Sequence, residues 1–382
     1  MRIAINALAM KSPYHGMGSY IGNLIHNLSV IDQNNQYLVF VSPVTLPYFA
    51  RRPNPRIELR QVALRRPLRI LWEQIALPRI LAKEHIDVFH GPAHTIPLRR
   101  VCAQVVTIHD LLWFVLPRVD RSIKHIYFRN MIPASARAAD QVITISKASK
   151  KDLVQIIGTA PSRITVVYLA ISDRYRVLAD RRQLAITRAK HRIPPRYILF
   201  VGVLERKKNL GRLITAFHRL KSMSPLPHHL VIAGSTMSSK HDDLRQLVRG
   251  FHLEDSVHFI GSAAEDDLAA IYNMADLFCL PSLYEGFGIP ALEAMACGVP
   301  VIVSNVSSLP EIVGDAGQLV DPYNENAIAD MMIKVLTDKG LSEGMRRRGL
   351  RRAKEFSWVR TAEETLRVYS HVYDQRAGAK RT

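Results

Sequence analysis

The chain has 382 residues, of which 48% are hydrophobic and 22% are charged. This composition is that of a packed globular protein and excludes a disordered chain, and the length suits two domains of ordinary size. Lysine and arginine total 52 against 33 acidic residues, so the formal net charge is +19. That excess favours contact with polyanions such as nucleic acid, phosphorylated small molecules or an anionic membrane face.

The cysteines and the apolar stretches bear on the cellular compartment. Cys102, Cys279 and Cys297 are widely separated and form no CxxC motif, so they predict small buried residues in a reducing compartment rather than disulfides or a metal site. The opening MRIAINALAM runs directly into an expected strand, and we expect no secretory signal. The longest mainly uncharged stretch, residues 282–304, is interrupted by Glu293, so no membrane-spanning helix of about 20 apolar residues is expected. A cytoplasmic protein is predicted.

Short apolar runs rich in valine and isoleucine recur along the first part of the chain. Helix-length segments separate most of these runs, which predicts a parallel sheet covered on both faces. The runs are residues 2–8, 37–42, 87–91, 105–110, 141–146 and 164–169, and the helical segments include 18–29, 71–84 and 123–139.

The same pattern starts again in the second part of the chain, at residues 197–202, 229–234, 257–261, 277–282, 299–304 and 317–322. A charged stretch without strands, residues 172–195, separates the two series and is the expected linker. The sequence therefore predicts an α/β fold of two Rossmann-like, doubly wound domains, 1–175 and 190–356, and a basic helical tail, 357–382. Two such domains facing each other make a cleft, and ligands of open parallel sheets bind beyond the carboxyl ends of the strands.

In the first domain, candidate residues follow two of the expected strands. Gly16 and Gly18 precede an expected helix, whose first N–H groups suit a phosphate, although an ordinary glycine turn explains them equally well. His109 lies where the run 105–110 ends. It could orient a sugar hydroxyl or steady developing charge, and the alternative is a histidine satisfied by a neighbouring backbone carbonyl.

In the second domain, three consecutive cations follow the first strand. Arg206, Lys207 and Lys208 lie just before an expected helix that begins near Asn209. Cations beside the start of a helix favour a diphosphate site, and a solvated loop is the alternative.

Two glutamates flank the glycine-rich stretch EGFGIPALE. Pro290 is expected to begin a helix that Gly298 ends, which places Glu285 on the preceding loop and Glu293 near the first turn. A carboxylate in the first turn complements the helix dipole, and this accounts for Glu293 but not for Glu285. Paired acids that accept from hydroxyl groups, beside the N–H groups of residues 286–289, suit a sugar and a ribose. No metal-ligand spacing accompanies the two acids.

Together these stretches resemble the signature of glycosyltransferase family 4, whose members are retaining enzymes with the GT-B fold. The resemblance covers nearly the whole chain, and its blocks occur in the family's order. They are MRIAINAL…GMGSYIGNL, ADQVITISKASKKDL, VGVLERKKNL, EGFGIPALEAMACGVPVI, LPEIVGDAGQLVDP and FSW. The resemblance implies an acceptor-binding N-terminal domain, a nucleotide-sugar-binding C-terminal domain, and a C-terminal helix that returns to the N-terminal domain.

The resemblance also implies roles for single residues. Glu293 would hold the ribose hydroxyls of the donor, Glu285 would contact the donor sugar and stabilise charge, and Lys208 matches the family's phosphate-binding lysine. Lys207 stands where an arginine is common, and a lysine is a point charge rather than a bidentate fork. The other matching positions are Gly16 and Gly18 of the phosphate loop, His109 near the reactive face of the sugar, the amides of Gly286, Phe287 and Gly288, and Arg206 as a further phosphate contact.

The mechanism that the resemblance implies needs neither metal nor cofactor. Lys208, its neighbours and the helix N-termini would neutralise the leaving diphosphate. The acceptor would attack on the face that the phosphate leaves, and the departing phosphate would take the acceptor's proton.

The stretch FHGPAHTIPL, followed by VVTIHDLLWFVLP, resembles bacterial mannosyltransferases that build O-antigen or capsule polysaccharide. This implies GDP-mannose as donor, with a UDP-hexose as the alternative, and a glycan or lipid-linked acceptor. Residues 65–83 combine cations with apolar side chains, which suits peripheral attachment to an anionic inner leaflet, and a core-packing helix is the alternative. The residues concerned are Arg65, Arg66, Arg69, Arg79 and Lys83 with Leu68, Ile70, Leu71, Trp72 and Ile75.

Two other classes remain open at this point. The first is a non-catalytic polyanion-binding protein, although the sequence contains no helix-turn-helix, basic recognition helix or aromatic-interleaved sheet, so we expect no nucleic acid partner. The second is an epimerase or phosphorylase of related architecture, and a phosphorylase would require a cofactor-lysine motif that is missing.

Overall fold

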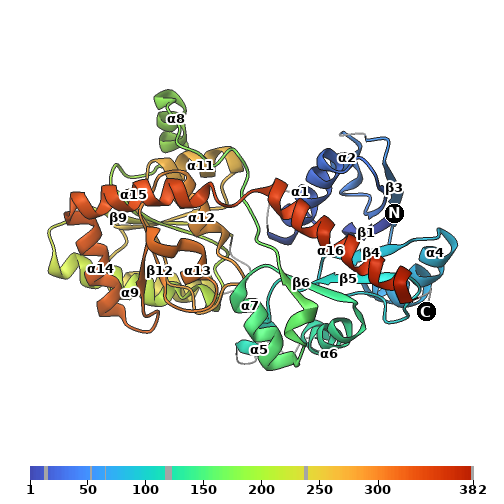
Figure 1. Ribbon diagram of the computed structural model, residues 1–382. Helices are drawn as coiled ribbons and strands as arrows, with labels where there is room; N and C mark the ends of the chain where they lie inside the picture. Colours follow the sequence, from blue (N-terminus) through green and yellow to red (C-terminus); the bar gives the residue numbers. More distant parts are fainter. Residues whose placement is uncertain (13–15, 52–53, 65, 117–122, 236–239, 380–382) are drawn as a thin grey trace. The chain divides into compact units, whose positions relative to one another are not determined.

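The computed structural model describes residues 1–12, 16–51, 54–64, 66–116, 123–235 and 240–379. It divides into two compact units, each built on one parallel sheet (Figure 1). Unit 1 comprises Met1–Ala170 and Ser357–Thr382, and unit 2 comprises Ile171–Phe356.

The sheet of unit 1 has seven parallel strands in the order β3-β2-β1-β4-β5-β6-β7. The strands are β1 (Arg2–Asn6), β2 (Gln36–Val41), β3 (Ile57–Gln61), β4 (Val88–Gly91), β5 (Ala103–Thr107), β6 (Gln141–Thr144) and β7 (Ile164–Val166). The helices are η1 (Ala7–Ala9), α1 (Gly16–Ile31), α2 (Leu46–Ala50), α3 (Arg66–Leu71), η2 (Trp72–Ala76), α4 (Leu77–Lys83), α5 (Leu112–Val115), α6 (Ile123–Ala138), α7 (Lys147–Asp152), η3 (Leu153–Ile157), η4 (Pro161–Arg163) and α16 (Trp358–Ala379).

The edge strand β3 was not among the predicted strands. None of its residues is fully buried, and it contains Glu58 and Arg60, which pair with each other and with the side chains of Arg2 and Glu84. An edge strand of this kind has no continuous apolar run, because only one of its faces packs on the core.

The last helix, α16, returns to unit 1, as predicted. It packs along α1 and against β4, β5 and β6 (Figure 1). Thr361 donates through Oγ1 to the carbonyl of Tyr168 at 2.7 Å, and Tyr369 Oη lies 2.6 Å from His90 Nδ1 on β4. The helix therefore completes the core of unit 1 rather than extending from unit 2.

The sheet of unit 2 has six parallel strands in the order β10-β9-β8-β11-β12-β13, and all six predicted runs form strands. The strands are β8 (Tyr197–Val201), β9 (His229–Ala233), β10 (Val257–Gly261), β11 (Leu277–Leu280), β12 (Val301–Ser304) and β13 (Gly317–Val320). The helices are α8 (Arg181–His191), η5 (Arg206–Lys208), α9 (Leu210–Met223), α10 (Lys240–Gly250), α11 (Glu265–Asn273), α12 (Ile289–Ala296), α13 (Leu309–Val313), η6 (Gly314–Ala316), α14 (Glu325–Thr337) and α15 (Lys339–Ala353).

The predicted linker, residues 172–195, is wrong, because this stretch belongs to unit 2. Its helix α8 packs on α11. Asp267 of α11 pairs with Lys190 at 2.6 Å and with His191 at 3.0 Å, and Arg174 pairs with Glu265 at 3.2 Å. The charges that suggested a solvated linker thus bind α8 and its flanks to α11, and the boundary lies between Ala170 and Ile171.

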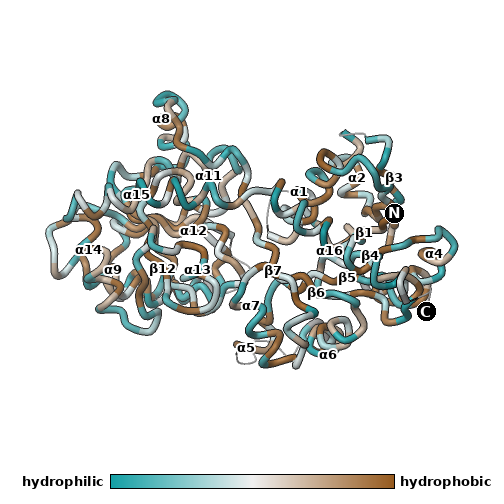
Figure 2. Tube along the Cα trace, in the orientation of Figure 1, coloured by the Kyte–Doolittle hydropathy of each residue, from teal (hydrophilic) through white to brown (hydrophobic). Residues whose placement is uncertain are grey.

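The strands inside each unit are largely hydrophobic (Figure 2), and most of their residues are buried. Cys102, Cys279 and Cys297 are buried free thiols, in agreement with their predicted role as small core residues. None of the helices in the described ranges is both long and apolar enough to cross a membrane.

Candidate active site

The carboxyl edge of the unit 2 sheet brings a predicted lysine and a predicted glutamate together. Lys208 ends the turn η5, which follows β8, and Glu285 lies on the loop between β11 and α12. Lys208 Nζ lies 2.6 Å from Glu285 Oε1, and both side chains are buried. The hydroxyl of Ser282 donates to the same carboxylate oxygen at 2.7 Å. A buried charge pair of this kind is retained only when good geometry and further hydrogen bonds offset the cost of its desolvation.

Asn209 fastens the loops that carry this pair. Its backbone is left-handed, with φ 60°, a conformation that asparagine tolerates better than most residues. Its side-chain nitrogen donates to the carbonyl of Pro281 at 3.0 Å and to that of Pro322 at 2.6 Å. Asn209 therefore joins the loops after β8, β11 and β13. Sequence reasoning missed this role and used Asn209 only to mark a helix start.

Two serines hold the glycine-rich loop in place. Ser307 Oγ accepts from the N–H of Glu285 at 2.9 Å, and Ser308 Oγ donates to the carbonyl oxygens of Glu285 at 2.9 Å and Phe287 at 2.8 Å. Gly288 has φ 108°, and a Cβ atom there would lie 2.6 Å from Leu309 Cδ2. The left-handed backbone favours glycine at this position, and the loop that includes the buried Gly286 and Phe287 leads directly into α12.

Glu293 is the fifth residue of α12 and lies just past the first turn, close to its predicted position. The helix begins at Ile289, so its dipole does not account for Glu293. Instead, Tyr272 of α11 donates through Oη to Glu293 Oε2 at 2.8 Å, and the hydroxyl of Tyr175 is a second hydrogen-bond partner. Neither tyrosine was a sequence candidate, since no local pattern links them to α12.

The two glutamates differ in protonation. Burial raises the pKa of Glu293 to about 8, and the hydroxyls of Tyr272 and Tyr175 offset only part of that effect. Burial also raises the pKa of Glu285, but the charges of Lys208 and Lys207 outweigh it and hold the pKa below its usual value. At neutral pH one acid is therefore ionised and the other is protonated. Two acids with pKa values moved apart are typical of a functional site.

The other two predicted cations are more accessible. Arg206 is exposed and Lys207 is half-buried, and the carbonyl of Lys207 accepts from the N–H of Leu283 at 2.7 Å. This bond ties the cation-bearing turn to the loop of Glu285. The charges of Arg206 and Lys207 lie next to Lys208 along one turn.

A pocket of about 500 Å³ lies at the same edge of the sheet, beyond β9 and β10. Gly234 at the end of β9 forms part of its wall, and a Cβ atom there would lie 1.8 Å from the carbonyl oxygen of Gly202. The guanidinium carbon of Arg245 lies 5.3 Å from the centre of the Phe259 ring, and both side chains line the pocket. Sequence reasoning missed this pocket. The one signal for it was a glycine at the end of each of β9 and β10.

The remaining predicted residues, Gly16, Gly18 and His109, belong to unit 1 and are described within it. Gly16 begins α1 with φ 53°. A Cβ atom on Gly18 would lie 1.9 Å from the carbonyl oxygen of Ser12. The glycine at position 18 is therefore required by the close approach of the Ser12 backbone.

His109 follows β5 and is buried. Its Nε2 lies 2.9 Å from the carbonyl oxygen of Pro92, which is the backbone partner considered as the alternative to a functional role. Its ring centre lies 4.9 Å from that of Tyr20 and 5.3 Å from that of His94. Burial lowers the pKa of His109 more than the Pro92 carbonyl and Asp110 raise it. The ring is therefore neutral at pH 7, with Nε2–H donating to Pro92.

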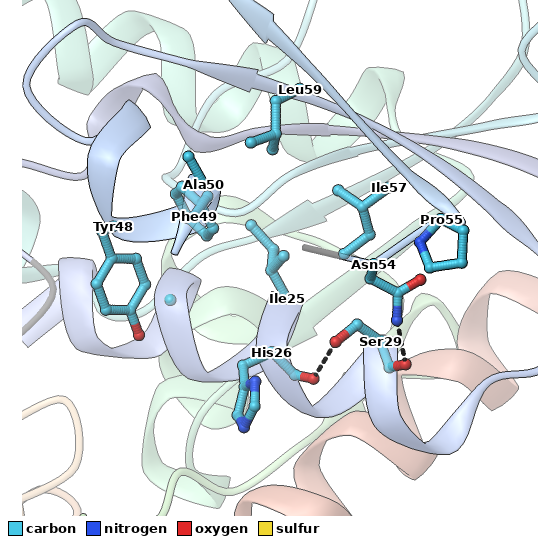
Figure 3. A pocket seen from close by; sticks show the side chains of 11 residues that line it. Ile25, His26, Ser29, Tyr48, Phe49, Ala50, Asn54, Pro55, Ile57 and Leu59 are labelled. Carbon is cyan, nitrogen blue, oxygen red and sulfur yellow. Dashed lines mark hydrogen bonds between the residues drawn. The ribbon is translucent and has the colours of Figure 1, made fainter. Parts of the chain in front are cut away.

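A second pocket, of about 430 Å³, contains none of the predicted residues. It lies in unit 1 between α1, α2 and β3. Figure 3 shows Ile25, Phe49, Ile57 and Leu59 around it, with His26 and Asn54 among the polar lining. Two hydrogen bonds hold its rim, from Asn54 to the carbonyl of Ser29 and from the Ser29 hydroxyl to the carbonyl of His26.

Within the described part of the chain, no group of three or more His, Cys, Asp or Glu side chains is arranged to hold a metal ion. The polar groups of the unit 2 site are instead a charge pair, a protonated acid and a fixed loop at the start of a helix. That set suits a ligand with negative charge at one end and hydroxyl groups at the other.

Comparisons with known proteins agree with this chemistry. Residues 185–352 match the family described as glycosyl transferases group 1, and residues 14–174 match glycosyltransferase family 4. The O-antigen chain mannosyltransferase B of Escherichia coli is 30% identical over 97% of this chain and 99% of its own length. The serotype-specific mannosyltransferase WbdA of the same organism is 28% identical over 74% of this chain, and the match spans 34% of WbdA.

Solved structures show the same fold at lower identity. Sucrose-phosphate synthase from Thermosynechococcus elongatus has a TM-score of 0.76 at 20% identity, covering 98% of this chain and 100% of that one. Anabaena Alr3699/HepE in complex with UDP and glucose has a TM-score of 0.75 at 18% identity, covering 97% and 100%. The family match and the relatives confirm the prediction of an enzyme, and they do not support the alternative of a non-catalytic polyanion-binding protein. The chain belongs to the group 1 and family 4 glycosyltransferases, and it is a glycosyltransferase with the GT-B fold.

Proposed function

We propose that this glycosyltransferase moves mannose from GDP-mannose, with retention at the anomeric carbon, to a glycan or lipid-linked acceptor in the synthesis of a surface polysaccharide. The observation that carries the proposal is the buried pair of Lys208 and Glu285 at the start of α12. The choice of mannose rests on the Escherichia coli O-antigen relative, which matches over nearly its whole length.

Each residue of the unit 2 site has a part in this reaction. Lys208 and Lys207 neutralise the diphosphate that leaves, with the exposed Arg206 as a further contact. Glu285, kept ionised by Lys208, stabilises the positive charge that develops on the sugar. Glu293 accepts from the ribose hydroxyls, and the amides of residues 286–288 donate to sugar or phosphate oxygens. The roles that the resemblance implies for Gly16, Gly18 and His109 of unit 1 stay predictions, since within unit 1 Gly18 leaves room for the Ser12 carbonyl and His109 donates to the Pro92 carbonyl.

The chemical step needs no separate base. The bond from the anomeric carbon to the phosphate oxygen breaks, and the acceptor oxygen bonds to that carbon on the same face. The acceptor's proton passes to the departing phosphate, so atoms and charges balance. Lys208 stabilises the negative charge that builds up on the phosphate before the proton arrives, and neither a metal nor a cofactor is required in this scheme.

The pocket beyond β9 and β10 would receive the nucleobase of the donor. Its volume of about 500 Å³ is within the range of small-ligand sites. A UDP-hexose is the second candidate donor, because Anabaena Alr3699/HepE, which has the same fold, is known in complex with UDP-glucose.

A thermal-shift screen tests the donor. With EDTA present, GDP-mannose is expected to raise the melting temperature by several degrees, since a ligand at a hundred times its Kd stabilises the folded state by about 2.7 kcal/mol. UDP-glucose and ADP-glucose are expected to act more weakly. A larger shift with UDP-glucose than with GDP-mannose would identify a UDP-sugar as the donor. No shift with any nucleotide sugar would contradict the proposed reaction.

We also propose that the helical segment formed by α3, η2 and α4 attaches the enzyme peripherally to an anionic leaflet. Leu68, Leu71 and Ile75 are 53%, 56% and 51% exposed, and spacings of three and four residues place them on one helical face. Leu64, which lies outside the helix, is also exposed. The opposite face packs on the core through the buried Leu77 and Leu81. The segment is therefore both a core helix and a carrier of an exposed apolar stripe.

The cations of this segment do not all face the solvent. Arg79 and Lys83 are exposed and continue the stripe at spacings of four residues. Arg69 instead donates through Nη1 to the carbonyl of Leu8 at 2.6 Å, so its predicted place on the membrane face is wrong. Arg65 and the side chain of Arg66 lie outside the described part of the structure.

Vesicle binding tests this attachment. The double variant Leu68→Ser and Leu71→Ser is expected to bind vesicles of phosphatidylglycerol and phosphatidylcholine about tenfold more weakly than wild type, because two apolar side chains no longer enter the interface. The control is Ile186→Ser with Met223→Ser, which changes two exposed apolar residues of unit 2. Equal binding of the wild type to anionic and to neutral vesicles would contradict the proposal.

A further inference from the structure

Glu73 is a buried acid that the proposed reaction does not yet use. It lies in η2, a π-helical turn between α3 and α4, and it is 4% exposed. Its Oε2 accepts from Asn6 Nδ2 at 3.3 Å, and Oε1 has no hydrogen-bond partner among the described residues. Since Asn6 is the last residue of β1, Glu73 lies at the carboxyl edge of the unit 1 sheet.

The protein keeps this acid at a cost. Burial raises the pKa of Glu73, and the Thr95 hydroxyl and the Arg69 charge lower it only in part. The guanidinium of Arg69 donates to the Leu8 carbonyl and forms no hydrogen bond with Glu73 Oε1. A buried polar atom without a partner is unfavourable and rare in folded proteins. Single π-turns within α-helices are also frequent at functional sites.

The surroundings of Glu73 are those of a polar recognition site. The hydroxyl of Thr95 lowers the pKa of both Glu73 and Tyr127, so it lies close to both side chains. Next along the chain, the ring centre of His94 lies 5.3 Å from that of His109. The residues that follow β1, β4 and β5 thus form one polar row from Glu73 to His109.

Aromatic rings border the same row. Trp113 and Phe128 stack with ring centres 5.6 Å apart, and Phe128 lies 6.0 Å from His94. Carboxylate, hydroxyl and aromatic groups together suit a sugar, whose hydroxyls donate to the acid and whose C–H face packs on a ring.

We propose that Glu73 binds a hydroxyl group of the acceptor sugar at the carboxyl edge of the unit 1 sheet. The inference rests on the proposed function and extends it to the acceptor. It also assigns a function to both faces of the helical segment formed by α3, η2 and α4. The outer face, with Leu68, Leu71 and Ile75, meets the lipid to which the acceptor is anchored, and the inner face, with Glu73, meets the sugar.

Steady-state kinetics of Glu73→Gln tests the role. The acceptor probe is octyl α-mannoside, and the donor is the nucleotide sugar that stabilises the wild type most. The KM for octyl mannoside is expected to rise about tenfold, because a tenfold change in affinity corresponds to the loss of about one hydrogen bond to a carboxylate. The KM for the donor is expected to stay within about twofold. The melting temperature is expected to stay equal or rise, because a buried acid with one unpartnered oxygen is removed.

The matched control is Glu84→Gln, which removes an acid just beyond the end of α4. Glu84 pairs with Arg2 and Arg60 at 2.8 Å each, at the opposite edge of the sheet. This variant is expected to lower the melting temperature and to leave both KM values unchanged.

The outcomes separate the two proposals. If the wild type transfers sugar to octyl mannoside and Glu73→Gln has the same acceptor KM, or a changed donor KM only, Glu73 is not an acceptor-binding residue. If Glu73→Gln merely lowers the melting temperature, its role is structural. If the wild type neither binds a nucleotide sugar nor modifies the alkyl mannoside, the proposed function itself fails.

Discussion

Replacing Lys208 with methionine is expected to lower the rate of sugar transfer by about 10²–10³-fold, the usual effect of removing one group that stabilises transition-state charge. In the wild type, Lys208 Nζ lies 2.6 Å from Glu285 Oε1. The substitution leaves the buried Glu285 carboxylate without this cation. Breaking a buried charge pair from one side costs about 3–5 kcal/mol, so the free energy of unfolding should fall by that order. Activity is measured as release of nucleoside diphosphate, and stability by urea unfolding.

A double variant distinguishes the catalytic loss from the structural one. Lys208→Met with Glu285→Gln replaces both charges, so most of the lost stability is expected to return while activity stays low. Lys334→Met, on the exposed face of α14, is the control for loss of a lysine in unit 2. Full activity in the double variant would show that the pair only supports the fold. It would also remove the main observation behind the proposed function.

Binding of a nucleotide sugar is expected to release about one proton per protein at pH 7, because of Glu293. Burial holds its pKa at about 8 in the free protein, so the acid is mostly protonated. Ribose hydroxyls that donate to this group favour its ionised form. Affinity should therefore rise with pH up to about 8 and then level off. Calorimetry in two buffers of different ionisation enthalpy measures the released proton.

Glu293→Gln removes this linkage and provides the control. Proton release is expected to vanish, and the affinity for the nucleotide sugar is expected to fall about tenfold or more, since the amide is a weaker acceptor for two hydroxyls. A nucleotide sugar is the right probe, because its diphosphate carries no terminal phosphate that titrates near neutral pH. Buffer-independent heats in the wild type would contradict the role of Glu293.

The same pKa shift has a consequence for stability in the absence of donor. The folded state keeps a proton on Glu293 that the unfolded state loses above its ordinary pKa of 4.5, and the folded pKa is about 8. Stability from this group is therefore fully present below pH 4.5 and declines as pH rises to about 8, by up to about 1.4 kcal/mol per pH unit. The free energy of unfolding of the wild type should therefore fall between pH 4.5 and about pH 8 relative to that of Glu293→Gln, as measured by urea unfolding at several pH values.

The strands and the main site residues could be predicted because their signals are local. Continuous apolar runs mark strands buried on both faces, and they located every strand except β3, which carries charges at the sheet edge. The lysine and the glutamate of the unit 2 pair follow strand ends that share one edge, so the topology alone brings them close.

The rest depends on contacts between distant parts of the chain. The charged residues of α8 suggested a linker, because their partners on α11 lie far along the sequence. The partners of Glu293 are similarly remote, since Tyr175 and Tyr272 come from two other segments. Asn209 and Glu73 gave no signal at all. Asn209 donates to the carbonyl groups of two residues far along the chain. Glu73 is notable only because its Oε1 lacks a hydrogen-bond partner among the described residues of the folded chain.

The return of α16 to unit 1 affects the order in which the protein can fold during synthesis. Unit 1 consists of the first and the last parts of the chain, and all of unit 2 is encoded between them. On the ribosome, unit 2 emerges complete while the first 170 residues still lack the helix that supplies Tyr369 and Val372 to their core. The nascent N-terminal part must therefore wait, with the side of β4, β5 and β6 that α16 covers still open to solvent and to chaperones, until α16 has been synthesised.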